Sequence, residues 1–230
     1  MRYYLCSSLV DYSKMELHNE YHWVEDLLKH VKFPCHALLV ASSPDEIEKT
    51  RRYAQEIVDV MDKNGLCLSG FDILDRNSAK RTKELVNKAD IIIAMGGHVP
   101  TQNAFFQEID LKKHLQDFNG IWIGSSAGSM NSATLVYAQP ELEGEVIDST
   151  YQRFVPGLGL TEKMMIPHYS SWKNEVVDGF RLLEDVTYPD SQGHTFYLME
   201  DGSYVLGDTE EKIEEVVGEY YVLRDGVIVQ

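Results

Sequence analysis

Short apolar segments alternate with amphipathic segments along the first 125 residues of the chain. The apolar segments predict buried strands. The segments between them, in which apolar residues recur three or four positions apart, predict helices. The expected strands cover residues 3–7, 37–41, 66–74, 91–94 and 121–124, and the expected helices cover residues 16–30, 45–63, 79–87 and 102–117. Strands that alternate with helices of this length are typical of a parallel sheet.

The segment at residues 45–63 shows the helical pattern most clearly. Apolar residues such as Ile47 and Ile57 recur at spacings near 3.6 residues, and charged residues occupy the opposite face. Pro44 suits the first turn of a helix, and Gly65 suits the position just after its end.

After about residue 140 the pattern changes to shorter apolar segments. Residues 144–149 and 164–166 predict further strands, and residues 172–183 predict a helix. Two Asp-Gly pairs, at 201–202 and 225–226, suit tight turns and predict hairpins. These hairpins would join residues 196–199 to 204–206 and residues 220–223 to 227–229. The pattern as a whole predicts one α/β domain over residues 1–230, with antiparallel additions at its C-terminal side.

The chain is strongly acidic, with 21 Lys and Arg against 37 Asp and Glu and a formal net charge of −16. This charge repels phosphate backbones and anionic membranes, so it disfavours nucleic-acid and membrane partners. No segment approaches the roughly 20 apolar residues that span a bilayer, and the first residues lack a secretory signal, so we expect a cytoplasmic protein. Cys6, Cys35 and Cys67 form no C-x-x-C motif, and we expect neither a metal site nor a disulfide framework.

The most informative motif is Gly124-Ser125-Ser126-Ala127-Gly128, which follows a predicted strand and precedes a helix-compatible segment at 127–136. This is the pattern of a nucleophile elbow, in which a sharp turn exposes the hydroxyl of the central serine. The N–H of Ala127 would then face a developing oxyanion at a helix N-terminus. The alternative is a turn of small residues that only joins strand to helix.

A second motif, Gly96-Gly97-His98, ends the predicted strand at 91–94. Glycines here would let backbone N–H groups approach a ligand closely, so Gly97 could supply a second oxyanion donor. The alternative is a turn that needs positive φ. Neither a G-x-G-x-x-G nor a Walker pattern is present, which disfavours phosphate binding.

A serine nucleophile needs a general base, and eight histidines are available. His168 is the strongest candidate because it follows the predicted strand at 164–166, and sites in open α/β sheets lie at the carboxyl ends of strands. His98 and His194 are the alternatives, and His98 is expected to bind substrate rather than to act as the base.

A carboxylate is expected to orient the base. Glu200 is the first choice because it ends an apolar strand and precedes a turn. The alternatives are Asp201 and the acidic segment with Glu141, Glu143, Glu145 and Asp148, which is expected to be a solvated loop.

Four segments in this order resemble the dipeptidase E (aspartyl dipeptidase) and cyanophycinase family of serine peptidases. They are Ile-Ile-Ile-Ala-Met-Gly96-Gly97, Gly124-Ser-Ser126-Ala-Gly128, Ile166-Pro-His168-Tyr169 and Leu198-Met-Glu200-Asp-Gly-Ser203. The resemblance implies a class I glutamine-amidotransferase-like (flavodoxin-like) fold, a three-layer α/β/α sandwich. It also implies that no cofactor or metal takes part.

The resemblance carries residue roles over to this chain. Ser126 falls on the nucleophile, His168 on the base and Glu200 on the acidic residue, with the backbones of Gly97 and Ala127 as the oxyanion hole. Gly96, His98 and Ser125 are expected to contact substrate.

Some family features are changed in this sequence. His98-Val99-Pro100 replaces an Asn-Thr-Phe stretch, Ser125 replaces a tryptophan, and the Gly-Glu-Thr-Arg stretch that would hold a substrate aspartate is missing. Glu141 is the nearest counterpart, by count, of a further acidic residue between nucleophile and base. The hydrolytic groups are retained, and those for an N-terminal aspartate are not.

Our hypothesis is therefore a serine peptidase that cleaves a peptide or amide bond of a small peptide. An esterase or acyl hydrolase that uses the same elbow is one alternative, and a non-catalytic binding or regulatory domain is another. The oligomeric state is open, with a homodimer as one option.

Overall fold

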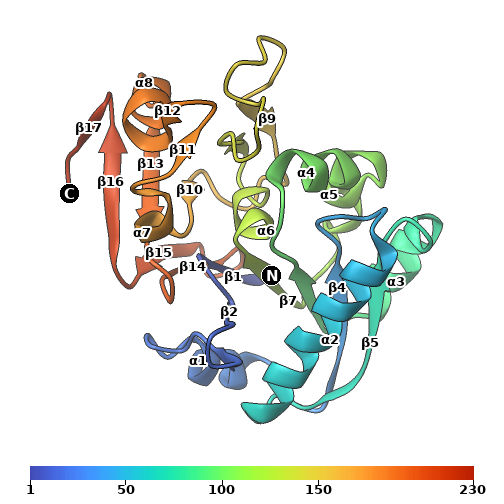
Figure 1. Ribbon diagram of the computed structural model, residues 1–230. Coiled ribbons are helices and arrows are strands. Elements are labelled where there is room, and N and C mark those ends of the chain that lie inside the picture. Colours follow the sequence, from blue (N-terminus) through green and yellow to red (C-terminus); the bar gives the residue numbers. More distant parts are fainter.

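A seven-stranded sheet forms the centre of the computed structural model, which describes residues 1–230 (Figure 1). Its order is β15-β14-β1-β7-β6-β4-β5. The strands are β1 (Arg2–Cys6), β4 (Cys35–Val40), β5 (Leu68–Leu74), β6 (Ile91–Ala94), β7 (Ile121–Ser125), β14 (Tyr204–Asp208) and β15 (Ile213–Val217). The five strands from β1 to β5 in this order run parallel, whereas β14 and β15 add antiparallel at one edge. The predicted mostly parallel α/β fold is confirmed.

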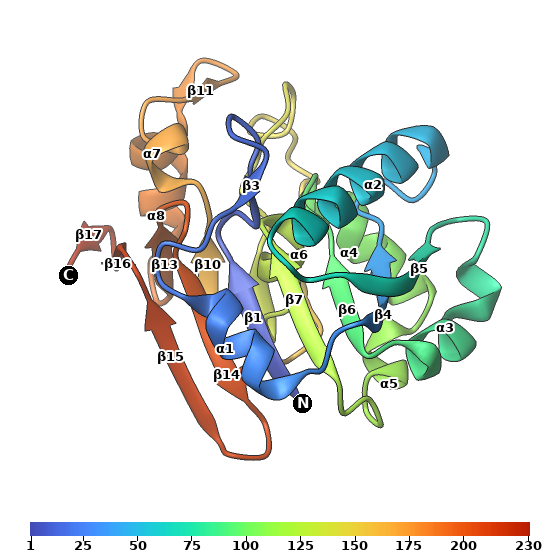
Figure 2. The ribbon, with the colours of Figure 1, turned by 90° about the horizontal axis from the view of Figure 1, so that it is seen from below.

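Helices cover both faces of this sheet, which explains why its inner strands are largely apolar (Figure 2). Side chains of β6 alternate between the faces, so that Ile91 and Ile93 join one core and Ile92 joins the other. The first core includes α1 (Trp23–His30) and α2 (Ile47–Lys63). The second includes α3 (Thr82–Lys88), α4 (Val99–Glu108) and α5 (Leu111–His114), and a short 3-10 turn at Ala79–Arg81 precedes α3. The result is a sandwich of three layers.

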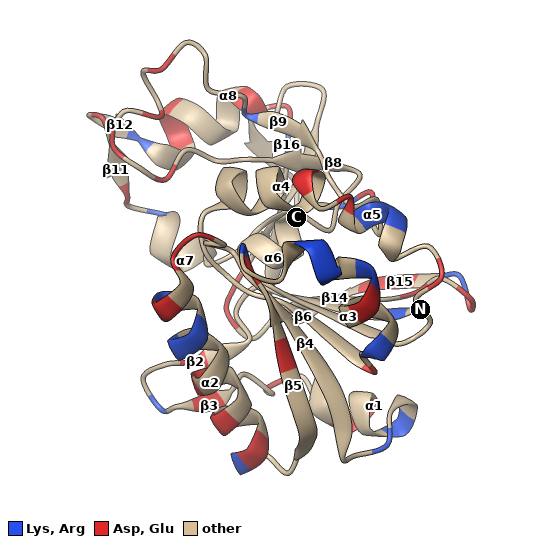
Figure 3. Ribbon diagram, turned by 90° about the vertical axis from the view of Figure 1, so that its right-hand side faces the viewer, with Lys and Arg blue, Asp and Glu red and all other residues tan.

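Charged residues are concentrated on the helices and loops (Figure 3). The inner strands β4, β6 and β7 contain no Asp, Glu, Lys or Arg. None of the helices is both long and apolar enough to cross a lipid bilayer.

A second, four-stranded sheet packs beside the edge of the large sheet that is formed by β14 and β15 (Figure 2). Its order is β10-β13-β16-β17, with β10 (Met164–Ile166), β13 (Thr195–Met199), β16 (Tyr220–Arg224) and β17 (Val227–Ile228). The predicted hairpin around Asp225-Gly226 is confirmed, and both turn residues have positive φ, 49° and 81°.

The other predicted hairpin is wrong. Strand β13 pairs with β10 and β16, whereas β14 pairs with β1 and β15 in the large sheet. Asp201-Gly202 still forms a tight turn, with Gly202 at φ 91°, but the two strands diverge because each is paired on both sides with other strands. The turn therefore connects the two sheets.

Several predicted boundaries also change. Residues 144–149 form no strand, because the carboxylate of Asp178 binds the N–H groups of Gly144 and Val146 and holds a loop. The predicted helix at 16–30 is helical only over Trp23–His30, two short strands and their turns replace most of the predicted helix at 172–183, and 102–117 divides into α4 and α5. The remaining elements are β2 (Val10–Asp11), β3 (Glu16–Leu17), α6 (Ala127–Met130), β8 (Leu135–Tyr137), β9 (Phe154–Pro156), α7 (Tyr169–Trp172), β11 (Val176–Val177), β12 (Phe180–Arg181), a π-helical turn (Leu182–Thr187) and α8 (Tyr188–Asp190).

The carboxyl ends of the parallel strands lie in one row. Cys6 at the end of β1 is in register with Ser125 of β7, and Val40 of β4 is in register with Ala94 of β6. The residues that follow these strands therefore meet along one edge of the sheet.

Candidate active site

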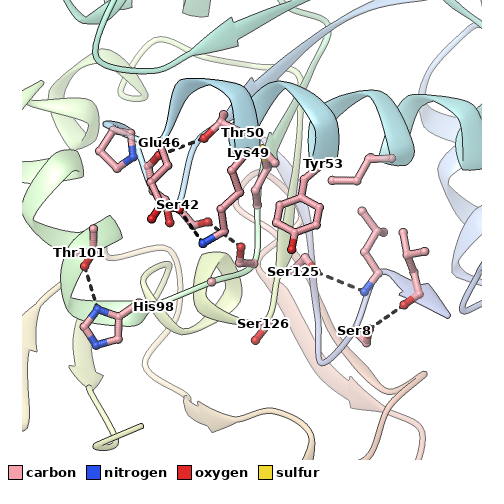
Figure 4. A pocket seen from close by; sticks show the side chains of 18 of the residues that line it. Ser8, Ser42, Glu46, Lys49, Thr50, Tyr53, His98, Thr101, Ser125 and Ser126 are labelled. Atoms are coloured by element: carbon pink, nitrogen blue, oxygen red, sulfur yellow. Dashed lines mark hydrogen bonds and ion pairs between the residues drawn. The ribbon is translucent and has the colours of Figure 1, made fainter. Parts of the chain in front are cut away.

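A pocket of about 700 Å³ opens at this edge of the sheet (Figure 4). Its wall combines segments that follow four different strands of the large sheet, together with His168, which follows β10. The predicted site residues among its lining are Gly96, Gly97, His98, Ser125, Ser126 and His168.

Ser126 occupies the strained turn that the sequence predicts. Its φ of 49° and ψ of −113° are unusual for any residue with a side chain. Its N–H donates to the carbonyl of Cys6 at 3.1 Å, and its own carbonyl accepts from the N–H groups of Ser129 and Met130. Backbone hydrogen bonds to a strand and to a helix thus hold the turn from both sides.

The flanking glycines are required by close packing. A Cβ at Gly128 would collide with the carbonyl oxygen of Ala94, and a Cβ at Gly124 would lie 2.8 Å from the Cα of Ser129. The helix α6 can therefore approach the sheet edge closely, which leaves the half-buried Ser126 side chain at the border of the pocket.

His168 is held by a carboxylate through one ring nitrogen. Its Nδ1 lies 2.6 Å from Oδ1 of Asp201, and its Nε2 has no partner within the protein. Partial burial acts to raise the pKa of Asp201, but the hydrogen bond from His168 and the attraction of that ring when it is protonated outweigh it, so the pKa lies below its usual value. An ionised Asp201 accepts from Nδ1 and leaves Nε2 able to accept a proton.

The expectation that Glu200 orients the histidine is wrong. Its carboxylate accepts from the hydroxyl of Ser170 at 2.8 Å and from the N–H of Ser170 at 3.2 Å. Both residues follow the last residue of β13, Met199, and in the turn that begins there only Asp201 contacts His168.

Ser7, which the sequence did not single out, connects the histidine and the aspartate. Its hydroxyl is fully buried, accepts from the N–H of His168 at 2.9 Å and lies 3.1 Å from Oδ1 of Asp201. The same hydroxyl lies 3.2 Å from the carbonyl of Met199. The sequence gives one indication of this role: Ser7 is a small polar residue at the end of a strand, and the neighbouring strands of the sheet lead into site residues.

Two backbone N–H groups beside Ser126 are free. Neither Gly97 nor Ala127 donates its N–H to another group of the protein. Gly97 has a φ of 155° and faces Ser42, whose Cβ would lie 2.7 Å from a Cβ at this position. The site thus offers two unpaired donors at the places where the sequence predicts an oxyanion hole.

The rings of the other two candidate histidines make contacts elsewhere in the protein. His98 uses both ring nitrogens, one with Thr101 Oγ1 and one with Glu145 Oε1, each at 2.8 Å. His194 stacks on Phe154 with ring centroids 4.5 Å apart and does not line the pocket. Of the three candidates, only His168 presents a free nitrogen there.

Ser125 and the acidic segment have structural contacts of their own. The Ser125 hydroxyl accepts from the N–H of Leu9 at 3.3 Å. The acidic segment is a loop that is solvated only in part: Glu143 and Asp148 are exposed, whereas Glu145 is only 15% exposed and also accepts from the N–H of Glu141. Burial and the charge of Glu145 raise the pKa of Glu141 to about 7. No group of three or more His, Cys, Asp or Glu is arranged to hold a metal ion.

Comparisons with known proteins agree with this architecture. A peptidase from an acI-B1 actinobacterium superposes with a TM-score of 0.63 at 21% identity, over 97% of this chain and 91% of that one. A putative peptidase E from Listeria monocytogenes EGD-e superposes with a TM-score of 0.60 at 14% identity, over 94% and 98%. No curated protein is significantly similar in sequence. The sequence profile of peptidase family S51 matches residues 25–214, and the chain belongs to that family.

Proposed function

We propose that this chain is a serine peptidase that cleaves a peptide or amide bond of a small peptide, with Ser126 as nucleophile and His168 as general base. The observation that carries the proposal is His168: Asp201 holds Nδ1, Nε2 has no partner within the protein, and His168 lines the same pocket as Ser126. Asp201 replaces Glu200 as the residue that orients the base. Membership of family S51 supports the same reaction class.

In the proposed reaction, Ser126 Oγ attacks the carbonyl carbon of the substrate while His168 Nε2 takes the hydroxyl proton. The oxyanion that forms accepts hydrogen bonds from the N–H groups of Gly97 and Ala127. His168 then protonates the leaving amine, and water hydrolyses the acyl-enzyme by the reverse set of proton transfers. Each donor in such a site typically contributes roughly 10²–10³ in rate.

Ester hydrolysis needs the same groups, so it remains a second activity to be measured on the same pocket. Ratios of kcat/KM for matched ester and dipeptide substrates separate the two activities.

Selectivity for an N-terminal aspartate is not part of the proposal. Lys49 is the one Lys or Arg in the pocket wall, and it pairs with Glu46 at 2.6 Å. A substrate carboxylate would have to compete with Glu46 for it. We therefore expect neutral dipeptides to be cleaved at least as fast as those that begin with aspartate.

Covalent labelling with a fluorophosphonate tests the proposal. We expect a single adduct, detected by intact mass and located on Ser126 by peptide mapping, and none on Ser126→Ala. Ser125→Ala is the matched control, because its hydroxyl contacts only the N–H of Leu9. A folded wild-type protein that takes up no label, or a Ser126→Ala variant that still hydrolyses dipeptides, would contradict the proposal.

A further inference from the structure

We propose that Ser42 is a positioning residue that holds the Gly96–Gly97 peptide so that the N–H of Gly97 faces the oxyanion. This inference rests on the proposed function. It adds to that function a residue that acts through an oxyanion donor and not directly on the reacting atoms.

The first step is a hydrogen bond that fixes the peptide. The Ser42 hydroxyl donates to the carbonyl of Gly96 at 2.6 Å, and Ser42 is only 7% exposed. The peptide between Gly96 and Gly97 is trans, so its C=O and N–H point in opposite directions. Because the carbonyl points toward Ser42, the N–H of Gly97 points away from it.

The second step places this peptide beside the nucleophile. A Cβ at Gly96 would lie 3.4 Å from the Cβ of Ser126 and 3.4 Å from the carbonyl oxygen of Ser125. Ser42 and Ser126 line the same pocket (Figure 4). The N–H of Gly97 therefore lies next to the Ser126 turn without any partner in the protein.

The third step concerns the freedom of this peptide. Gly97 has no side chain and a φ of 155°, so little intrinsic preference opposes rotation of the peptide in front of it. Rotation by half a turn would exchange donor and acceptor and would present the Gly96 carbonyl to a developing negative charge. The Ser42 hydrogen bond favours the productive orientation, and its loss leaves that orientation without support.

The fold brings Ser42 to this place. Strands β4 and β6 are neighbours, and the N–H of Met95 donates to the carbonyl of Val40 at 3.0 Å. The segments that follow the two strands therefore run side by side. Ser43 provides a matched control, because it lines the same pocket and its hydroxyl makes no hydrogen bond within the protein.

The test compares wild type, Ser42→Ala, Ser42→Cys and Ser43→Ala by the second-order rate constant for fluorophosphonate labelling of Ser126. We expect labelling to slow by roughly 10- to 100-fold in Ser42→Ala, somewhat less than direct loss of a donor. Ser42→Cys keeps the size of the side chain but donates weakly, so it should also slow. Ser43→Ala should stay within about twofold of wild type, since no hydrogen bond is removed.

Two further readouts separate positioning from damage to the fold. The midpoint of the pH–rate profile should not move, because the contacts of His168 and Asp201 are unchanged. The Tm of Ser42→Cys should stay near that of wild type. Equal labelling of wild type, Ser42→Ala and Ser42→Cys would overturn the inference, and so would equal slowing in Ser43→Ala. If wild type is not labelled at Ser126, the proposed function itself fails.

Discussion

Ser126 and the free N–H groups beside it are fixed by backbone atoms, whereas His168 and Asp201 are fixed by side chains that meet between two sheets. The serine turn is held by hydrogen bonds from one strand and one helix and by two glycines with no space for a Cβ. The histidine follows a strand of the small sheet, and the aspartate lies in the connection between the sheets. Ser7, which follows β1 of the large sheet, binds both. The proposed nucleophile is thus a local feature of the chain, and the position of the proposed base depends on tertiary packing.

Exchange of the two neighbouring carboxylates tests this comparison most strongly. Asp201→Asn should lower kcat by roughly 10³-fold, because an amide no longer holds His168 in the required tautomer. Glu200→Gln should change kcat by less than about threefold, since it removes only a charge that binds Ser170. The measurement is kcat on the best dipeptide substrate, and a larger effect for Glu200→Gln would restore Glu200 as the orienting residue.

The packing of the serine turn is tested by adding one methyl group. Gly128→Ala places a Cβ against the backbone of Ala94 and should reduce the free energy of unfolding by about 2–3 kcal/mol. Gly70→Ala is the control, because its Cβ would meet His36 at an ordinary 3.4 Å. Thermal melts of the two variants measure the difference. Equal Tm values would show that α6 can move away from the sheet without cost.

The Ser7→Ala variant tests the second half of the comparison, the positioning of His168 and Asp201 by side chains. It leaves the N–H of His168 without its partner, which should cost about 1–3 kcal/mol of stability. We also expect kcat to fall roughly tenfold, with KM nearly unchanged, because Asp201 loses a partner in direct contact with the base. Ser8→Ala, whose hydroxyl donates to the carbonyl of Val10, should leave kcat unchanged. Equal kcat for Ser7→Ala and wild type would remove Ser7 from the positioning of the base.

The least direct test of the comparison is a pH dependence outside the reacting groups. The pKa of Glu141 is raised to about 7 in the folded protein, so the folded state binds a proton that the unfolded chain, with a carboxyl pKa of about 4.3, has already released. This contribution to stability is present below pH 4 and is lost as the pH rises through 7. Glu141→Gln should therefore flatten the decline of Tm between pH 5 and 8. Exposed Glu143→Gln should decline like wild type, and a parallel decline in Glu141→Gln would refute the assignment.

The difference between the two halves also explains what the sequence could predict. The five parallel strands, the elbow and the two glycines at 96–97 follow from contiguous patterns, because apolar period, turn residues and register act over a few neighbours. The choice between Glu200 and Asp201 does not, because it depends on the direction that a strand takes after its last residue. The role of Ser7 could not be predicted either, because its partners His168 and Asp201 lie 161 and 194 residues away in the sequence.

Strand β15 was missed for a related reason. Its sequence, Ile213-Glu-Glu-Val-Val217, has little apolar alternation, because it lies at the edge of the sheet and three of its residues are exposed. The false hairpin at Asp201-Gly202 shows the opposite case. The turn is predicted correctly, but β14 after it pairs with β1 at the other end of the chain. Local sequence patterns do not indicate such long-range pairing.

The turn at Asp201-Gly202 makes the reaction depend on how the two sheets are docked. A shift of the small sheet by roughly one or two ångströms would move His168 and Asp201 away from Ser7 and from the Ser126 turn, while leaving that turn and most of both cores intact. Moderate denaturant or heat should therefore abolish the proposed hydrolysis before the two cores unfold. Turnover would then report whether the two sheets are packed correctly, because a chain with displaced sheets would keep the Ser126 turn without a base to activate its hydroxyl.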